Sequence, residues 1–83
     1  MHERQWLVYV IHSLEGLSYV GMTANFEKRL NQHNSGISKW TRRGSGWSLT
    51  YPESFRSSDE ARRREKYFKN NAGREWLQRR GYL

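Results

Sequence analysis

Hydrophobic and polar residues follow one another in the first part of the chain in the pattern of a β-hairpin. Residues 6–11 are rich in aromatic and β-branched side chains and are apolar on both faces, which predicts a central strand. Residues 17–21 predict a second strand. The loop between them, residues 14–16, ends in Gly16, which can adopt the left-handed conformation that a three-residue hairpin loop requires.

The length of this loop determines which residues of the two strands face each other. It sets Tyr9 opposite Gly21. Two residues away it sets Ile11 opposite Tyr19. Diagonal cross-strand neighbours share one face of a sheet and are within reach of long side chains, so we expect the two tyrosines to meet there.

The segment after the hairpin has the period of an amphipathic helix. Thr23 predicts an N-cap for a helix over residues 24–34, and Gly36 predicts its end. At about 100° per residue, one narrow stripe of this helix carries Phe26, Leu30, His33 and Ile37. Arg29 lies at the edge of this stripe, one turn before His33, so the two side chains can act on the same object.

The second half of the chain predicts a loop, one more strand and two helical segments. Residues 35–46 are rich in Gly, Ser and Arg and indicate an exposed loop. Residues 47–51 alternate in polarity and stop at Pro52, which is typical of a strand near a sheet edge. Residues 57–60 fit a capping box that opens a helix to about residue 70, and residues 74–80 predict one or two last helical turns.

A carboxylate interrupts the apolar stripe of the longer helix. The stripe consists of Ala61, Glu65, Phe68 and Ala72. Burial of an ionised carboxylate costs several kcal/mol unless the group is paired, hydrogen-bonded or bound to a metal. Two explanations are open for Glu65: a structural ion pair with Arg29 or another arginine, and a hard cation such as Mg²⁺, which keeps several waters and takes one or two protein oxygens.

The other candidate residues also have both a structural and a functional explanation. Tyr9 and Tyr19 can be ordinary sheet aromatics, or one of them can act as a base if cations lower its pKa. Arg29 can cover the core with its stem, or stabilise charge that develops on a phosphate. His33 can be a hydrogen-bonded core residue or transfer a proton. Together with Glu65 they converge from consecutive elements, as the residues of an active site must.

Composition adds a strongly basic and aromatic character. Lys and Arg number 15 against 8 Asp and Glu, and the formal charge of +7 indicates an anionic partner. The 83 residues suit one small domain over residues 1–83, and 12 aromatic side chains indicate that it folds. The absence of cysteine excludes disulfides, thiolate zinc sites and a thiol nucleophile, and fits a reducing compartment. The longest apolar run, residues 6–11, is far shorter than the roughly twenty residues of a membrane span, so we expect a soluble cytoplasmic protein with no membrane contact.

Read in chain order, the residues named above form a recognisable series. It comprises Leu7-Val8-Tyr9, Tyr19-Val20-Gly21, Thr23, Arg29, His33, Gly36 and Glu65. This series resembles the motifs of the GIY-YIG nuclease superfamily, and the resemblance covers about residues 6–81. The ending of the chain is similar to small bacterial stand-alone members related to the nuclease domain of the excinuclease C subunit. One departure is that residues 7–9 lack the leading glycine of the first motif while keeping its tyrosine.

The resemblance implies an α+β fold, with a small three-stranded antiparallel sheet flanked by α-helices, and hydrolysis of a DNA phosphodiester with one Mg²⁺ or Mn²⁺ ion. By position, Glu65 matches the metal-binding glutamate of the family. Arg29 matches the arginine that contacts the scissile phosphate. Tyr9 matches the tyrosine proposed to activate the attacking water, Tyr19 the second tyrosine of the site, and His33 the histidine four residues after the arginine.

The same resemblance leaves a late-chain residue undecided. Some members use an asparagine there, for which Asn70 and Asn71 are both candidates. Contacts with the DNA backbone are expected from Lys39, Arg42, Arg43, Arg62, Arg63 and Lys66, although charges of this kind can equally form a solvated face. No segment looks like a base-reading element, so we expect little intrinsic sequence preference.

Function at this point is predicted as a metal-dependent DNA endonuclease, in DNA repair or recombination, acting as a monomer or weak dimer and open to a partner protein. Two alternatives stay open. One is a catalytically silent basic module with a nuclease-like fold that binds nucleic acid without cutting it. The other is a small ribosome-associated or RNA-binding protein, for which charge and aromatic residues would be enough.

Overall fold

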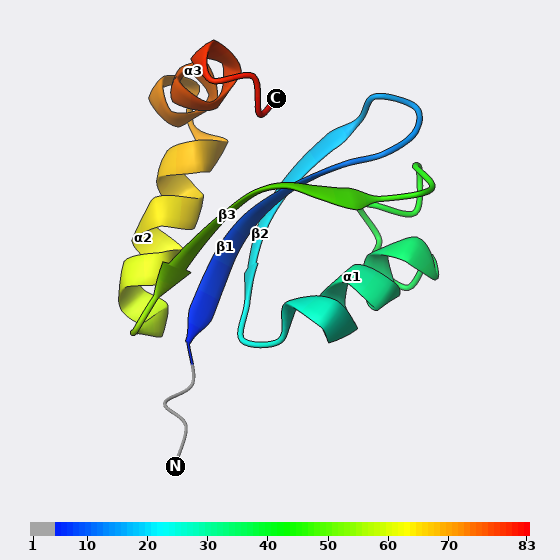
Figure 1. Ribbon diagram of the computed structural model, residues 1–83, viewed down its shortest axis with the longest axis horizontal. Helices are drawn as coiled ribbons and strands as arrows, with labels where there is room; N and C mark the ends of the chain where they lie inside the picture. Colours follow the sequence, from blue (N-terminus) through cyan, green and yellow to red (C-terminus); the bar gives the residue numbers. More distant parts are fainter. Residues whose placement is uncertain (1–4) are drawn as a thin grey trace.

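Three antiparallel strands and three helices form the protein, of which the computed structural model describes residues 5–83. The elements are β1 (Trp6–His12), β2 (Ser18–Thr23), α1 (Phe26–Asn34), β3 (Ser48–Phe55), α2 (Ser58–Lys69) and α3 (Asn71–Arg79) (Figure 1). The sheet order is β2-β1-β3, and both outer strands run antiparallel to β1. The predicted α+β class, with a three-stranded antiparallel sheet flanked by helices, is confirmed.

The hairpin of β1 and β2 has the predicted register. Tyr9 pairs with Gly21, and Ile11 pairs with Tyr19. Gly16 has a φ of +88°, which is the left-handed conformation that the short loop requires. Loop length and side-chain alternation are local properties of the sequence, and together they determine this register.

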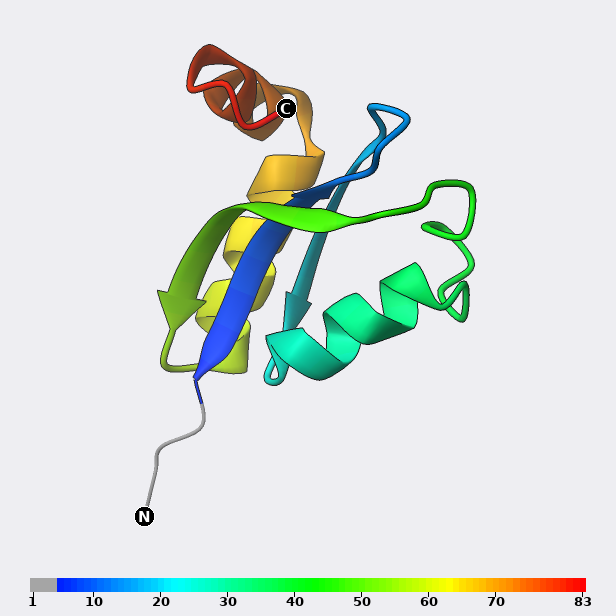
Figure 2. The same cartoon turned by 45° about the vertical axis from the view of Figure 1, so that its right-hand side comes forward.

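The sheet separates two hydrophobic clusters. The cluster on the side of α2 and α3 is formed by Val8, Val10, Val20, Ala61, Phe68 and Leu77. On the opposite face, Tyr9, Ile11 and Trp47 pack with residues of α1 and β2. The two views of the ribbon show α1 on one side of the sheet and α2 with α3 on the other (Figures 1 and 2). Because successive side chains of a strand point to opposite faces, β1 contributes to both clusters.

The predicted start of α1 is wrong by two residues. Its N-cap is Asn25, whose side chain accepts a hydrogen bond from the Lys28 N–H at 3.2 Å. Thr23 still belongs to β2, and its hydroxyl accepts from the Asn25 N–H in the turn that follows. The helix ends before Gly36, which has a φ of +80°, as predicted. Ile37 lies beyond this end and is 73% exposed, so it is not part of the buried stripe.

The strand β3 continues past Pro52, where the sequence predicts its end. It runs to Phe55, and Pro52 pairs with Tyr9 in the middle of the ladder. Proline lacks an N–H, but an edge strand needs hydrogen bonds on one side only. The predicted edge position of this strand is confirmed.

The helix α2 breaks at Asn70 and a new helix begins at once. Ser57 accepts from the Glu60 N–H as the predicted cap of α2. The Asn70 side chain caps α3 by accepting from the Gly73 N–H at 3.1 Å, so α3 begins at Asn71 and not at residue 74. Ala72 is exposed for this reason and leaves the predicted stripe. None of the helices in the described part of the chain has the length and apolar character needed to cross a membrane.

Candidate active site

The site is centred on Tyr9, in the middle strand and almost fully buried. Its hydroxyl oxygen lies 2.9 Å from Nε2 of His33, which α1 directs toward the sheet. The Tyr19 ring lies 6.4 Å from the Tyr9 ring and 5.0 Å from the His33 ring, measured between centroids. The hairpin register and the helical period thus bring these three predicted site residues together.

A second hydrogen bond fixes the His33 ring at the nitrogen that does not face Tyr9. Its Nδ1 lies 2.7 Å from Oγ1 of Thr41, and the Thr41 side chain is fully buried. The carbonyl of Thr41 accepts a hydrogen bond from the Trp47 indole at 2.8 Å. The prediction of an exposed loop over residues 35–46 is therefore wrong at Thr41 and at the buried Ser38. Sequence reasoning missed Thr41 because nothing in the local pattern distinguishes it from its polar neighbours.

Burial keeps both members of the Tyr9 and His33 pair neutral near pH 7. It raises the pKa of Tyr9 to about 12, with a further contribution from Tyr19, while Arg29 beside the hydroxyl acts in the opposite direction. Burial, and then the positive charge of Arg29, lower the pKa of His33 to about 4. The tyrosine consequently keeps its proton and the imidazole carries only one.

Arg29 extends from α1 beside both tyrosines. Burial acts to lower its pKa, but the interactions with the Tyr9 and Tyr19 hydroxyls outweigh this and raise it. Its guanidinium donates to the Gln32 side-chain carbonyl at 2.9 Å. Within residues 5–83 it forms no ion pair with a carboxylate. The guanidinium therefore has hydrogen-bonding capacity left for a ligand.

An open cleft lies against Arg29. Its volume is about 510 Å³, and it is formed at the junction of the two strands with the first turns of α1. The residues that line it are Trp6, Met22, Thr23, Ala24, Asn25, Lys28, Arg29 and Gln32. Of the predicted site residues, Arg29 lines the cleft, whereas Tyr9, Tyr19, His33 and Glu65 are not among its lining residues.

Glu65 reaches the site from α2, which packs against β2. Its side chain is 20% exposed, so the carboxylate is not enclosed by the apolar stripe as predicted. The ion pair with Arg29 or another arginine, one of the two explanations that the sequence left open, is not formed among the described residues. The partner of Glu65 is Lys69, whose Nζ lies 3.7 Å from Oε2. Lys69 also lies 5.6 Å from the centre of the Tyr19 ring, and the charge of Glu65 raises the pKa of Tyr9. Glu65 therefore belongs to the surroundings of the two tyrosines.

The donor set suits a hydrated hard cation. Among residues 5–83 no three His, Cys, Asp or Glu side chains gather in one place. Glu65 offers one partly exposed carboxylate whose existing ion pair is long. Magnesium commonly binds proteins through one or two carboxylates and keeps its other ligands as water, so these residues fit Mg²⁺ or Mn²⁺.

Gly21 allows the two tyrosines to lie close together. A Cβ atom at this position would be 2.5 Å from the Tyr9 hydroxyl oxygen and 2.9 Å from a ring carbon of Tyr19. Real Cβ atoms do not approach other atoms so closely. The glycine is thus required by the close approach of the aromatic rings, and its backbone adopts no unusual conformation.

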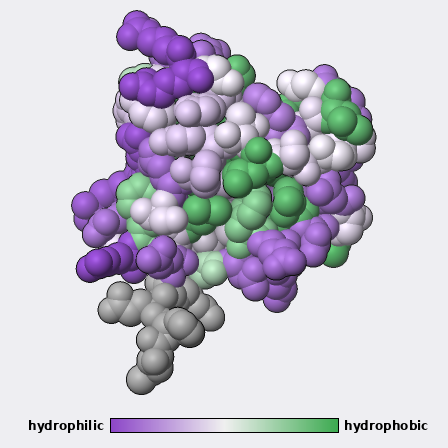
Figure 3. All heavy atoms as spheres, in the orientation of Figure 1, coloured by the Kyte–Doolittle hydropathy of each residue, from purple (hydrophilic) through white to green (hydrophobic). Residues whose placement is uncertain are grey.

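The basic residues expected to bind DNA are all exposed. Lys39, Arg42 and Arg43 lie in the loop after α1, and Arg62, Arg63 and Lys66 lie on α2. In the space-filling view, hydrophilic side chains gather at the margins of the molecule over α1, α2 and α3, with apolar side chains between them (Figure 3). The exposure of these six basic residues agrees both with contacts to the DNA backbone and with a solvated face, so DNA contact at these residues stays a prediction.

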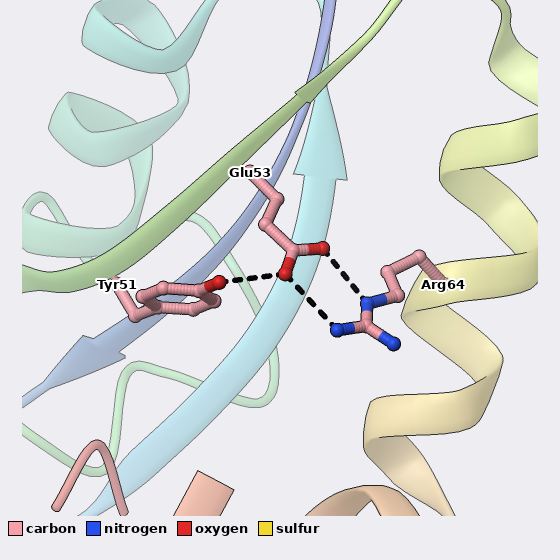
Figure 4. A network of polar contacts seen from close by, with 3 residues as sticks. All are labelled: Tyr51, Glu53 and Arg64. Atoms are coloured by element: carbon pink, nitrogen blue, oxygen red, sulfur yellow. Dashed lines mark hydrogen bonds and ion pairs between the residues drawn. The ribbon is translucent and has the colours of Figure 1, made fainter. Parts of the chain in front are cut away.

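A second polar cluster, on the other face of the sheet, was not predicted. Glu53 on β3 accepts two hydrogen bonds from Arg64 of α2, at 2.8 and 3.1 Å, and one from the Tyr51 hydroxyl at 2.6 Å (Figure 4). The Arg64 guanidinium lies 4.4 Å from the Phe68 ring centre and 4.9 Å from that of Trp76. Only the tertiary packing brings these side chains together, so no sequence spacing signals them.

Comparison with known proteins agrees with this geometry. The family model of the GIY-YIG catalytic domain matches residues 5–79. A UPF0213 protein of Streptococcus agalactiae is 41% identical over 63 residues, which are 75% of this chain and 72% of that protein. A UPF0213 protein of Halobacterium salinarum is 42% identical over 59 residues, 70% of this chain and 77% of that one. The solution NMR structure of a UPF0213 protein from Bacillus halodurans is similar with a TM-score of 0.57 and 28% identity, covering 94% of this chain and 86% of that structure. The chain therefore belongs to the GIY-YIG family, a nuclease superfamily, and its relatives are small UPF0213 proteins.

Proposed function

We propose that this protein is a divalent-metal-dependent endonuclease that hydrolyses DNA phosphodiester bonds. The observation that carries the proposal is that Arg29, which has no carboxylate partner among the described residues, lies beside both tyrosine hydroxyls. The charge of the weakly paired Glu65 also acts on Tyr9. Family membership supports nuclease chemistry in general. The choice of DNA, the metal and a role in DNA repair or recombination are part of the proposal.

Arg29 would bind and stabilise the scissile phosphate. A guanidinium offers planar, bidentate hydrogen bonds to phosphate oxygens and keeps its charge at any physiological pH. Preorganised positive charge of this kind is most effective where negative charge develops in the transition state. Its position beside the cleft and beside the Tyr9 hydroxyl would place the phosphate next to the group that handles the proton of water.

Tyr9 and His33 would control that proton. With a pKa of about 12 the Tyr9 hydroxyl does not ionise on its own, and further positive charge near its oxygen is needed to lower that pKa. A neutral His33 can donate its Nε2–H to the Tyr9 oxygen while its Nδ1 accepts from the Thr41 hydroxyl. This tautomer favours the ionised tyrosine, because a hydrogen bond to the charged form stabilises it.

Glu65 would hold the divalent ion. When bound, such an ion supplies Lewis-acid stabilisation of the leaving oxygen and positive charge near the tyrosines. Lys69 competes for the same carboxylate, but at 3.7 Å and half exposed it is a weak rival. The exposed arginines and lysines would neutralise flanking phosphates without reading bases, so little sequence preference is expected.

A nicking assay tests this proposal. Supercoiled plasmid is incubated with the protein in Mg²⁺, in Mn²⁺ and in EDTA, and DNA binding is measured separately by fluorescence anisotropy in EDTA. We expect nicked circles in the presence of either metal and none in EDTA. Binding without nicking under all conditions would favour the silent nucleic-acid-binding module, and binding restricted to structured RNA would favour the RNA-binding alternative.

A further inference from the structure

An exposed tryptophan lies among cations in the loop between α1 and β3. We call residues 37–43 the Trp40 loop. Trp40 is 68% exposed, and three exposed basic residues, Lys39, Arg42 and Arg43, lie within three positions of it. A large aromatic side chain gains free energy on burial, so an exposed indole beside three cations has both an apolar face and positive charge to offer to a ligand.

The backbone that carries Trp40 is held in place. Ser38 is buried, and its carbonyl accepts a hydrogen bond from the Arg42 N–H at 3.1 Å. Thr41 is fully buried, with its hydroxyl on His33 and its carbonyl on the Trp47 indole. Trp40 lies between these two anchors. The loop therefore presents the indole to solvent from a fixed position.

The anchors also connect the Trp40 loop to the candidate active site. Thr41, the residue next to Trp40, hydrogen-bonds His33, and His33 hydrogen-bonds the Tyr9 hydroxyl. Two hydrogen bonds thus separate the neighbour of Trp40 from the oxygen at the centre of the site. Thr41 is thus shared by the Trp40 loop and by the hydrogen-bond network of the candidate site.

We propose that Trp40 stacks on an unpaired DNA base, so that the protein prefers DNA that contains unpaired nucleotides. In an intact duplex the base faces are covered by their neighbours, whereas an unpaired base offers a free π face to an indole. Proteins that bind single strands combine such aromatic platforms with basic residues along the backbone, and each stacked base contributes without regard to its identity. The three basic residues of the Trp40 loop would contact the DNA backbone beside the stacked base.

This inference rests on the proposed function for the identity of the ligand as DNA and names the substrate class. It agrees with the absence of a base-reading element, because stacking selects for accessibility of the base and not for its sequence. Instead of a DNA base, a second copy of this chain could cover the exposed side chains of Trp40 and Ile37. Charge argues against it, because like-charged loops would meet across such an interface.

The test measures binding in EDTA, so that it does not depend on cleavage. Three labelled ligands of one sequence are compared by fluorescence anisotropy: a paired duplex, the same duplex with a short unpaired bubble, and the single strand. We expect Trp40→Ala to weaken binding to the bubble and the single strand by roughly 5- to 150-fold, about 1–3 kcal/mol, while binding to the paired duplex stays within about twofold. Trp40→Phe should recover most of the loss, because it retains a π face.

Ile37→Ala serves as the matched control, since Ile37 is equally exposed in the same loop and has no π face. It should leave all three affinities unchanged. Equal weakening of all three ligands by Trp40→Ala, or no weakening, would overturn the inference. So would concentration-dependent dimerisation, seen in sedimentation, that Trp40→Ala abolishes. A protein that shows the expected selectivity but never nicks DNA would refute the proposed function and leave this inference intact.

Discussion

Two clusters of similar polar residues, one around Glu53 and one around Tyr9, differ in how many of their hydrogen-bonding and charged groups are already paired. On the side of α2 and α3, both carboxylate oxygens of Glu53 are engaged, by Arg64 and by the Tyr51 hydroxyl. Arg64 in turn lies against aromatic rings on its other side. Burial acts to raise the pKa of Glu53, but these partners outweigh it and lower that pKa. Both oxygens of the Glu53 carboxylate are therefore already hydrogen-bonded.

Around Tyr9 and Tyr19, which Arg29 approaches from α1 and Glu65 from α2, the charged groups have few partners. In the described part of the chain, Arg29 has no carboxylate partner and Glu65 has one long ion pair to a half-exposed lysine. Beside Arg29 lie Tyr9 and His33, a neutral pair with strongly shifted pKa values. Such shifts gather at functional sites more often than elsewhere. Both clusters contain Tyr, Arg and Glu, so residue type does not distinguish them, whereas the number of charged groups that are already paired does.

The largest effect is expected from Arg29→Ala. If the guanidinium stabilises the transition state, kcat should fall by about 10²–10³-fold, as for other preorganised charged or polar donors, while DNA affinity changes far less. Nicking rates and anisotropy measured on the same preparation separate the two. A loss of affinity equal to the loss of rate would show that Arg29 only docks the DNA.

The second effect is a pH dependence of stability that comes from the α1 side. The pKa of His33 is about 4 in the folded protein and near 6.5 when unfolded, so the unfolded state binds more protons in between. Stability from this group is full above pH 6.5 and is lost as the pH falls toward 4, by up to about 3 kcal/mol. Urea unfolding at several pH values measures the loss of stability, and NMR titration of the imidazole measures the pKa of His33. An imidazole that titrates near pH 6.5 would contradict the burial of His33.

The third effect concerns Gly21→Ala. The added methyl would collide with the Tyr9 hydroxyl, so one ring must move, at about 1–3 kcal/mol of unfolding free energy. Activity per folded molecule should fall as well, because the moved hydroxyl is at the centre of the site. Ser18→Ala, at an exposed position of the same strand, is the control. Wild-type stability and activity in Gly21→Ala would show that the tyrosines are not packed as described.

The smallest effect on activity is expected from Arg64→Ala, in the Glu53 cluster. Arg64→Ala leaves the Glu53 carboxylate without its bidentate partner in a partly exposed place, which should cost about 1–2 kcal/mol of unfolding free energy. Nicking per folded molecule should be unchanged. Chemical denaturation and a nicking assay at a temperature where the variant is folded check both parts. Loss of nicking in the folded variant would contradict the assignment of a purely structural role to the Glu53 cluster.

The sequence predicts those features of the fold and site that depend on local periodicity. The hairpin loop and the alternation of residues determine that Tyr9 and Tyr19 share a face, and the helical period determines that Arg29 and His33 lie one turn apart. The start of α1 is not predictable in this way, because Thr23 and Asn25 are both good caps. Only the length of β2, a tertiary property, decides between them.

The features that the sequence does not predict depend on segments that meet only in the folded protein. Thr41 lies in a polar loop, and its burial follows from the position of the His33 side chain that it supports. Glu53 and Arg64 pair across the sheet and helix layers. Glu65 was identified by its place in an apolar stripe, but the break at Asn70 and the edge of β2 leave it partly exposed, with a lysine as its neighbour.

The most direct test of the central claim compares two glutamates. Nicking of supercoiled plasmid in Mg²⁺ is measured for the wild type, Glu65→Gln and Glu53→Gln at equal concentrations of folded protein. We predict that Glu65→Gln loses at least about a hundredfold in rate, since metal-ion stabilisation supplies several kcal/mol and each 1.36 kcal/mol is tenfold. Glu53→Gln should be less stable and should nick at nearly the wild-type rate. A Glu65→Gln variant as active as the wild type, or equal losses in both variants, would contradict the account.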